Sequence, residues 1–417
     1  MDTKLSYLLK KVIKNSPQYK KERKILLNEF HLPTLVNSIN KSITNISFYK
    51  QHSYPKSTID NFNITTYPIL RKSDIMGHEE EFVSKKCIIP LMHKVKTGGS
   101  TGQSLQLYYS ISTLIKKDIV SDYAFSLIGK KLNIAILRGN KPKNGEISEV
   151  VNKKTLILSS YLISDDTLDT YLSLLNSHRI ECIHAYPSSL SILARLIKRR
   201  YHTANIPTLK GILTSSEIFS KEDKMLVKEV FPNVKVIDYY SHNELACCAL
   251  SIDGGHYTFF PNYGYVEFIE TGETLDNGNK IAEIIATSIM NSDMPFIRYG
   301  TDDYVELDSN NNVVSIIGRT SDFIINSDGN LIPCIISTRP ETLENVNKFQ
   351  YLQDEIGVLH FRIVVNNKFS PNDITFIQED LSNSFSGKIK SVIDIVDDIE
   401  RTKRGKQPRL IQKLNIR

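Results

Sequence analysis

The chain has 417 residues, of which 41 % are hydrophobic and 24 % are charged, ordinary values for a globular protein with a sizeable core. The length predicts two or more domains, and five sparsely spaced cysteines argue against a disulfide framework. The net charge of +6 fits an anionic ligand, but no basic stripe interleaved with aromatic residues is present, so we do not expect nucleic-acid binding.

The N-terminal segment lacks the features of a targeting or membrane sequence. Lysines interrupt the apolar residues of MDTKLSYLLKKVIKN, so the continuous apolar region of a signal peptide is missing. No apolar run approaches the ~20 residues that span a bilayer. We therefore expect a cytoplasmic protein without membrane insertion, and the sequence leaves its oligomeric state open.

From about residue 131 the sequence predicts strands that alternate with helices. Short apolar runs favour buried strands, which end near Leu137, Ser160, Tyr186, Ser216 and Tyr240. Pro187 is suited to the first turn of a helix, and Ser220 with Asp223 resembles the capping box of another. This alternation predicts parallel βαβ units, whose ligands bind at the carboxyl ends of the strands.

After about residue 254 the sequence becomes β-rich. The runs YVEFIE, AEIIATSI, DYVELD and VVSIIG are short strands, and Asp308-Ser309-Asn310-Asn311-Asn312 is a strong turn signal. Beyond residue 319, one amphipathic helix around 371–385 lies among further strands. We therefore predict an α/β protein with a large N-terminal domain over 1–319 and a small α+β domain over 320–417.

A glycine-rich segment is the first candidate site. Gly98, Gly99, Ser100, Thr101 and Gly102 offer backbone N–H groups and hydroxyls that can cradle a polyphosphate. The Gly-Lys-Ser/Thr of a Walker A loop is missing. A flexible polar turn is the structural alternative.

Five further residues could carry chemistry. Glu244 follows a predicted strand and could hold Mg²⁺ on a nucleotide phosphate, while Tyr240 offers an aromatic face to a base. Asp303 could accept hydrogen bonds from ribose hydroxyls, and Arg319 could reach ribose or phosphate oxygens. Lys406 follows a glycine and could enter a site as a point charge. Taken singly, each also fits a turn, a linker or a solvated tail.

The order of these motifs resembles that of adenylate-forming enzymes, the superfamily of acyl-CoA synthetases and peptide-synthetase adenylation domains. The series is TGGSTG, Tyr-x-x-x-Glu, RYGTDD, GRTSD and RTKRGK. Residues 184–189 and 213–217 are similar to segments of phenylacetate–CoA ligase-like proteins, a branch that includes proteins of capsule and other surface-polysaccharide clusters. The resemblance covers about residues 96–409 and only loosely the first 90.

The resemblance implies ATP and Mg²⁺ as cofactors and a role for each motif residue. It assigns residues 98–102 to phosphate, Ser216 to the nucleotide, Tyr240 to base stacking, Glu244 to Mg²⁺, Asp303 and Arg319 to ribose, and Lys406 to adenylation. A carboxylic acid would attack the α-phosphorus of ATP and release pyrophosphate. The acyl group would then pass to coenzyme A or to an amine or hydroxyl acceptor, such as a sugar, after the small domain rotates about residues 319–322.

Several positions depart from the family pattern. The departures are Gln103-Ser104, Ser241, Asn243, Asp302 and Ser321, and they leave open an inactive relative that binds nucleotide and serves as a scaffold. A metal-binding module built from Cys247, Cys248 and His256 is a second alternative, but adjacent cysteines lack the usual zinc spacing and fit a core better. For the acyl pocket we expect residues near Tyr123, Tyr186, Ser216 and His242.

Overall fold

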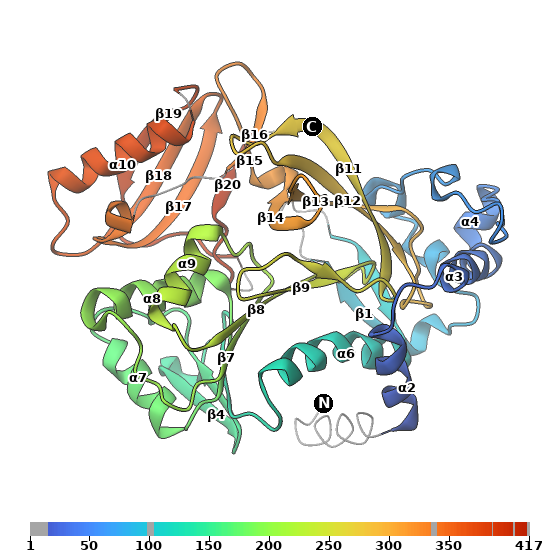
Figure 1. Cartoon of the computed structure of the whole chain (residues 1–417), viewed down its shortest axis with the longest axis horizontal. Coiled ribbons are helices and arrows are strands. Elements are labelled where there is room, and N and C mark those ends of the chain that lie inside the picture. The colour runs from blue at the N-terminus through green and yellow to red at the C-terminus, as the bar shows by residue number, and fades with distance from the viewer. Residues whose placement is uncertain (1–15, 98–103, 335–339, 386, 403–404, 415–417) are drawn as a thin grey trace. The chain divides into compact units, whose positions relative to one another are not determined.

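The computed structural model describes residues 16–97, 104–334, 340–385, 387–402 and 405–414 (Figure 1). The chain divides into two compact units, each treated by itself below. The first comprises Met1–Leu127, Tyr239–Leu250 and Tyr257–Val313, and the second comprises Ile128–Asp238, Ser251–His256 and Val314–Arg417. Within the described residues, no helix is both long enough and apolar enough to cross a bilayer.

Helices and short turns dominate the beginning of the first unit. The α-helices are α2 (Pro17–Leu26), α3 (Leu32–Asn45), α4 (Ser47–Gln51), α5 (Lys72–Ile75) and α6 (Ile111–Ile128), with 3₁₀ turns η1 (Ile64–Thr66), η2 (Glu79–Phe82) and η3 (Ile89–Leu91). Pro17 opens α2, where Ser16 Oγ accepts a hydrogen bond of 3.1 Å from the Tyr19 amide. Helix α3 buries one apolar face that includes Leu35 and Ile39.

Two further sheets contain strands of this unit. Strands β1 (His93–Lys96) and β2 (Gln106–Tyr109) form a hairpin in which Lys96 pairs with Gln106. Strands β11 (Gly264–Thr274), β12 (Lys280–Ser288), β13 (Tyr299–Leu307) and β14 (Val313–Arg319) follow one another in a four-stranded sheet. The Asp308 carboxylate closes the turn before β14 by accepting the amides of Asn310 and Asn312.

The largest sheet has eight strands in the order β10-β9-β8-β7-β6-β3-β5-β4. Their bounds are β3 (Ile134–Leu137), β4 (Ser148–Asn152), β5 (Thr155–Leu158), β6 (Cys182–Ala185), β7 (Gly211–Ser215), β8 (Lys235–Ser241), β9 (Cys248–Ile252) and β10 (Thr258–Phe259). Strand β3 pairs in parallel with β5 and β6, and β6 pairs in parallel with β7, as the alternating pattern predicted.

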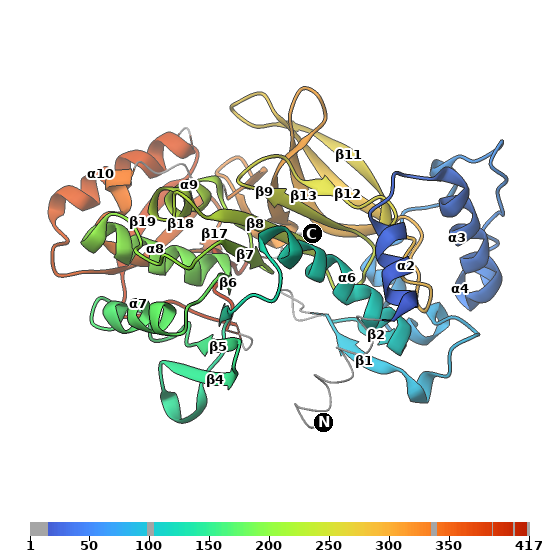
Figure 2. The ribbon, with the colours of Figure 1, turned by 60° about the horizontal axis from the view of Figure 1, so that its bottom comes forward.

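Three helices of the second unit pack near these parallel strands (Figures 1 and 2). They are α7 (Leu168–Ser177), α8 (Pro187–Tyr201) and α9 (Lys221–Val230), with η4 (Lys143–Gly145) preceding β4. The predicted caps are present, because Pro187 opens α8 and Ser220 Oγ accepts the Asp223 amide at 3.2 Å. Leu190, Leu193 and Ile197 of α8 are buried in the core that joins the helices to the strands.

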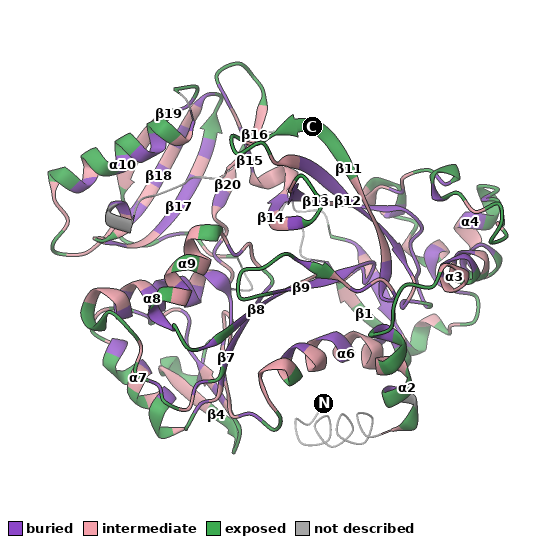
Figure 3. Ribbon diagram, in the orientation of Figure 1, coloured by how far each residue is buried: buried purple, intermediate pink, exposed green. Residues whose placement is uncertain are grey.

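The C-terminal part of the second unit is a small α+β module. Strands β17 (Val346–Glu355), β18 (Val358–Val365), β19 (Lys390–Ile395) and β20 (Leu410–Gln412) form a sheet in the order β19-β18-β17-β20, with α10 (Pro371–Ser384) against one face. Short elements η5 (Thr320–Asp322), β15 (Phe323–Ile325), β16 (Leu331–Pro333) and η6 (Pro340–Leu343) precede it. Ile377 and Leu381 are buried against the sheet, while the outer face of α10 is exposed (Figure 3).

The α/β architecture with a C-terminal α+β module is therefore confirmed. The predicted domain division between residues 319 and 320 stays a prediction.

Candidate functional site

The predicted phosphate loop, Gly98 to Gly102, lies outside the described residues. The residues that flank it form the end of the β1–β2 hairpin. Thr97 donates its amide to the Leu105 carbonyl at 3.0 Å, and the Leu105 amide donates to Thr97 Oγ1 at 2.9 Å. This pair links the described residues on either side of the glycine-rich segment. Tyr109 of β2 donates a hydrogen bond to the Asn243 carbonyl, which ties the hairpin to the Glu244 segment.

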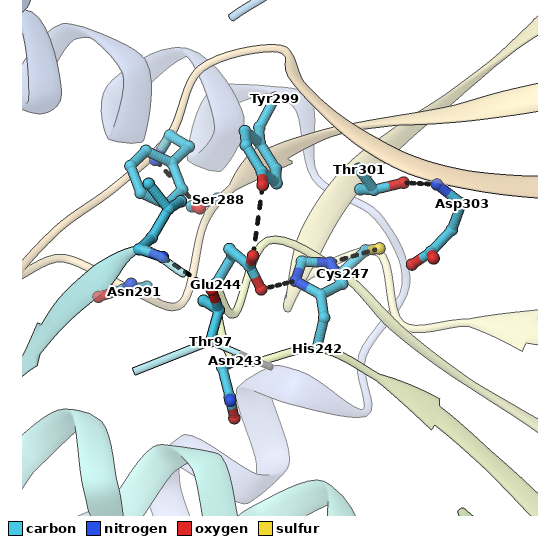
Figure 4. A network of polar contacts seen from close by, with 12 residues as sticks. Thr97, His242, Asn243, Glu244, Cys247, Ser288, Asn291, Tyr299, Thr301 and Asp303 are labelled. Atoms are coloured by element: carbon cyan, nitrogen blue, oxygen red, sulfur yellow. Dashed lines mark hydrogen bonds and ion pairs between the residues drawn. The ribbon is translucent and has the colours of Figure 1, made fainter. Parts of the chain in front are cut away.

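Glu244 is a buried carboxylate at the end of the segment that follows β8. The residue is only 6 % exposed, and Tyr299 Oη donates a hydrogen bond of 3.3 Å to Glu244 Oε1 (Figure 4). His242 Nδ1 lies 3.2 Å from Glu244 Oε2, within ion-pair distance. A buried carboxylate with two such neighbours is held in one orientation.

His242 links Glu244 to a cysteine. Its Nε2 lies 3.4 Å from Cys247 Sγ, on the opposite side of the ring from Glu244 (Figure 4). Burial alone would lower the pKa of His242, but Cys247 and Glu244 raise it to about 10. These two neighbours favour the protonated form of His242.

Tyr240 and Asp303, predicted to bind base and ribose, are directly hydrogen-bonded. Tyr240 Oη donates to Asp303 Oδ2 at 2.7 Å, although 63 residues separate them in the sequence. Asp303 is 7 % exposed, and its amide donates to Thr301 Oγ1 at 3.1 Å. The two predicted nucleotide-binding residues therefore belong to one hydrogen-bonded cluster.

A β-bulge aims the Asp303 side chain. Glu283 pairs with Tyr304 and Ile285 with Gly300, so three residues of β13 lie opposite the single residue Ile284. Thr301 Oγ1 fixes the bulge by donating to the Ile284 carbonyl at 2.9 Å. Bulges that redirect one side chain are common next to active sites.

The bulge also explains the departure from the family pattern at Asp302. This residue has a φ of 58°, the left-handed conformation that glycine adopts most easily. Aspartate tolerates this conformation better than most residues, so Asp302 can occupy a position that favours glycine. Its carboxylate lies 4.0 Å from Arg71, which leaves Asp303 as the ribose candidate.

Lys406 and Ser216 lie together in the second unit. Lys406 Nζ donates a hydrogen bond of 2.7 Å to the Ser216 carbonyl oxygen. Next to them, the Gln407 amide donates to Glu217 Oε1 at 2.9 Å and the Ser188 amide to Glu217 Oε2 at 3.1 Å. Burial raises the pKa of Glu217, although these donors and Lys406 oppose the shift. The C-terminal segment is thus attached to the carboxyl edge of the parallel strands.

Gly405 allows this attachment because no other residue fits its position. It has a φ of +75°, and a Cβ atom would lie 2.4 Å from Tyr161 Oη and 2.7 Å from Gly139 Cα. The turn that carries Lys406 is closed by Thr402, whose carbonyl accepts the Gly405 amide at 2.8 Å. The close packing of Gly405 against Gly139 therefore fixes the backbone position of the next residue, Lys406.

Arg319 ends β14, at the predicted hinge. The Asp322 carboxylate accepts the Arg319 amide at 2.8 Å and thereby caps η5. Gly318 before it has a φ of +124°, and a Cβ atom there would meet Asp322 Oδ2 at 2.6 Å. The hinge assignment and the ribose contact of Arg319 stay predictions.

The alternative of a metal module finds no geometric support. Among the residues that the structure describes, no group of three or more His, Cys, Asp or Glu side chains is placed to hold a metal ion. Cys247 and Cys248 are both 0 % exposed, as expected of core residues. Of the residues expected near the acyl pocket, Tyr123 and His242 belong to the first unit, and Tyr186 and Ser216 to the second.

Two polar residues in the second unit were not assigned a role from the sequence. Arg138 directly follows β3, and its Nη2 donates to Ser216 Oγ at 2.9 Å. Its guanidinium carbon lies 5.2 Å from the centre of the Tyr186 ring. The other is His184, whose Nε2 lies 3.4 Å from Ser215 Oγ. The sequence did offer one signal for Arg138, because a charged residue immediately after a buried parallel strand lies where such sheets bind ligands.

Comparisons with known proteins agree with this architecture. Residues 324–413 match the family model of the CapK C-terminal domain. Protein CapK of Staphylococcus aureus is 24 % identical over 397 residues, covering 87 % of this chain and 84 % of CapK.

Solved structures of acyl-activating enzymes share the fold. One is 2-hydroxyisobutyryl-CoA ligase bound to 2-HIB-AMP in its postadenylation state, with a TM-score of 0.66 and 12 % identity over 92 % of this chain and 88 % of that chain. Another is the anthranilate CoA ligase AuaEII bound to anthranoyl-AMP, with a TM-score of 0.51 and 12 % identity over 78 % of this chain and 66 % of that chain.

Proposed function

We propose that this chain, which has the fold of the adenylate-forming enzymes and a C-terminal domain of the CapK branch, activates a carboxylic acid with ATP. The products of the first step would be an acyl-adenylate and pyrophosphate. The observation that carries the proposal is the fold shared over nine tenths of the chain with 2-hydroxyisobutyryl-CoA ligase, whose structure holds an acyl-adenylate. The hydrogen-bonded clusters around Glu244, Asp303 and Lys406 support it.

Lys406 would be the main catalytic residue of the first step. Negative charge builds up on the phosphoryl oxygens as the carboxylate attacks, so catalysis depends on positioning and on positive charge. The ammonium group would bridge the carboxylate and the α-phosphate. Loss of such a charge commonly costs on the order of 10²–10³ in rate, by analogy with lost oxyanion donors.

Glu244 fits the requirements of a nucleotide-bound Mg²⁺. Magnesium is commonly held by one or two carboxylates together with substrate phosphates, and Glu244 supplies one oriented carboxylate. When bound, the ion would neutralise part of the phosphate charge.

The other motif residues would bind the nucleotide. Asp303 would accept hydrogen bonds from the ribose, Tyr240 would hold Asp303 and face the base, and Arg319 and Ser216 would complete the site. The glycine-rich segment 98–102 would bind the phosphates. Each of these roles follows from the motif order, and the hydrogen bond between Tyr240 and Asp303 supports the pairing of two of them.

The acyl acceptor would be coenzyme A or an amine or hydroxyl group. The names of both structural relatives above describe CoA ligases, which favours the thiol. The similarity to CapK supports the alternative of an acceptor in surface-polysaccharide biosynthesis.

Exchange of radiolabelled pyrophosphate into ATP tests the first step. We expect exchange that requires both a carboxylic acid and Mg²⁺ and that is lost in Glu244→Gln but kept in Glu273→Gln, whose side chain is exposed. The departures at Ser241 and Asn243 favour a scaffold as the second candidate. Tight ATP binding without exchange across a broad panel of acids would select that candidate.

A further inference from the structure

Arg138, Tyr186 and Ser216 follow three neighbouring parallel strands of the second unit. They come directly after β3, β6 and β7. Leu137 pairs with Ala185, and Ala185 pairs with Thr214, so these strands end at nearly the same level. Side chains that follow the carboxyl ends of adjacent parallel strands converge where such sheets bind ligands.

Arg138 is held in place on two sides. Its Nη2 donates to Ser216 Oγ at 2.9 Å, and its guanidinium carbon lies 5.2 Å from the centre of the Tyr186 ring. Stacking on an aromatic ring and one hydrogen bond orient the planar group. An oriented guanidinium is the side chain best suited to bind a carboxylate or phosphate through two parallel hydrogen bonds.

A second cation reaches the same serine. Lys406 Nζ donates to the Ser216 carbonyl oxygen at 2.7 Å, so the carbonyl and hydroxyl of one residue meet two positive groups. Ser216 is exposed and has a φ of 73°, an uncommon conformation for serine. Such backbone conformations are concentrated at functional sites.

The neighbouring titratable groups leave this edge of the sheet positive. Burial and the nearby Arg138 lower the pKa of His184 to about 3, so the imidazole is neutral. Glu217 directs its two oxygens to the amides of Gln407 and Ser188. Among the described residues, Arg138 and Lys406 thus bring two positive charges to Ser216, and the adjacent Glu217 brings one carboxylate.

We propose that Arg138 binds a second anionic group on the acid whose carboxylate Lys406 activates. This inference rests on the proposed adenylation, and it names the substrate class as dicarboxylic acids. One carboxylate would lie at Lys406 and become the adenylate. The other would lie at Arg138 and remain unchanged.

Paired acids of equal length test this substrate class. Pyrophosphate exchange is measured with succinate against butyrate, glutarate against valerate, and adipate against hexanoate. We expect the wild-type protein to prefer the diacid of at least one pair at least tenfold in kcat/KM. Arg138→Met should abolish that preference while changing the KM for ATP less than twofold, and Arg138→Lys should restore part of it. Arg200→Met, which removes an exposed arginine paired with Asp169, is the matched control.

Direct binding separates this inference from the proposed function. Calorimetric titration of the same diacids is made on wild-type and Arg138→Met protein in the presence of AMP. Diacid binding that is lost in Arg138→Met supports the inference even if no exchange occurs. A wild-type preference for monoacids would overturn the inference. A rise in the KM for ATP in Arg138→Met, with an unchanged ratio of diacid to monoacid kcat/KM, would also overturn it and would assign Arg138 to a nucleotide phosphate. Absence of diacid binding to the wild-type protein would overturn it as well.

Discussion

Lys406 donates a hydrogen bond of 2.7 Å to the backbone carbonyl of Ser216, which lies 190 residues earlier in the chain. The contact places the ammonium group at the carboxyl edge of parallel strands, where ligands of such sheets bind. It depends on the backbone of the preceding residue, Gly405, which packs against Gly139 and Tyr161. The first prediction concerns this packing.

We predict that Gly405→Ala lowers pyrophosphate exchange at least tenfold. The new Cβ would overlap Tyr161 Oη and the Gly139 backbone, so the turn that carries Lys406 must move. Gly387→Ala is the control, because Gly387 has a similar φ of +72° but nothing within 4 Å of its Cβ position. Both variants place alanine at a similar positive φ, which costs roughly 1–2 kcal/mol, and only the first should lose exchange. Equal losses in the two variants would show that strain alone is responsible.

The second prediction separates Asp303 from Asp302. Asp303→Asn should raise the KM for ATP at least tenfold, because an amide is a poorer acceptor for ribose hydroxyls. Tyr240→Phe should raise it about fivefold, which corresponds to one hydrogen bond of about 1 kcal/mol. Asp302→Asn keeps the side-chain shape and should leave this KM within twofold. A larger effect at residue 302 than at residue 303 would reverse the ribose assignment.

The third prediction concerns the attachment of the C-terminal module to α8. Arg195 and Arg409 both lie over the Phe349 ring, at 5.2 Å and 5.6 Å from its centre, and Arg195 pairs with Asp223 at 3.3 Å. Arg195→Ala leaves the mostly buried Asp223 carboxylate without this ion pair. We therefore expect urea unfolding to show a free energy of unfolding that is about 3 kcal/mol lower. Arg200→Ala breaks an exposed pair and should cost under about 1 kcal/mol. Similar losses at the two positions would mean that the buried pair contributes little.

The fourth prediction is a pH dependence from His184. Its pKa is about 3 in the folded chain, against an ordinary value of 6.5 for a histidine exposed to water. Below about pH 6.5, His184 is therefore protonated in the unfolded chain but stays neutral in the folded chain. The free energy of unfolding consequently decreases as the pH falls. Between pH 7 and pH 5 the loss should be about 2 kcal/mol. His184→Gln should remove that part of the pH dependence measured by urea unfolding, and an unchanged slope would exclude His184 as its source.

The strands and caps of the parallel region were predictable because local rules determine them. Buried parallel strands appear as short apolar runs, and β3, β6 and β7 lie where those runs predicted. The β1–β2 hairpin was not predicted, because its exposed strand β1, HKVK, has no apolar run. Helix α6 was also missed, because its apolar residues do not gather on one face.

The candidate site was predicted as single residues, and its contacts were not. The hydrogen bonds Tyr240–Asp303 and Lys406–Ser216 join distant residues, and tertiary packing alone creates them. The sequence showed Asp302 as a departure, but only the bulge reveals that its backbone keeps a glycine-like conformation. Arg138 was overlooked because a lone arginine after a strand carries no motif.

Pyrophosphate exchange in Lys406→Ala tests the central claim most directly, with Lys390→Ala, an exposed lysine of β19, as the control. The wild-type protein and Lys390→Ala should catalyse acid-dependent exchange at similar rates, and Lys406→Ala should lose about 10²–10³ in rate while still binding ATP. Exchange at the wild-type rate in Lys406→Ala would contradict the claim that this lysine carries the adenylation step.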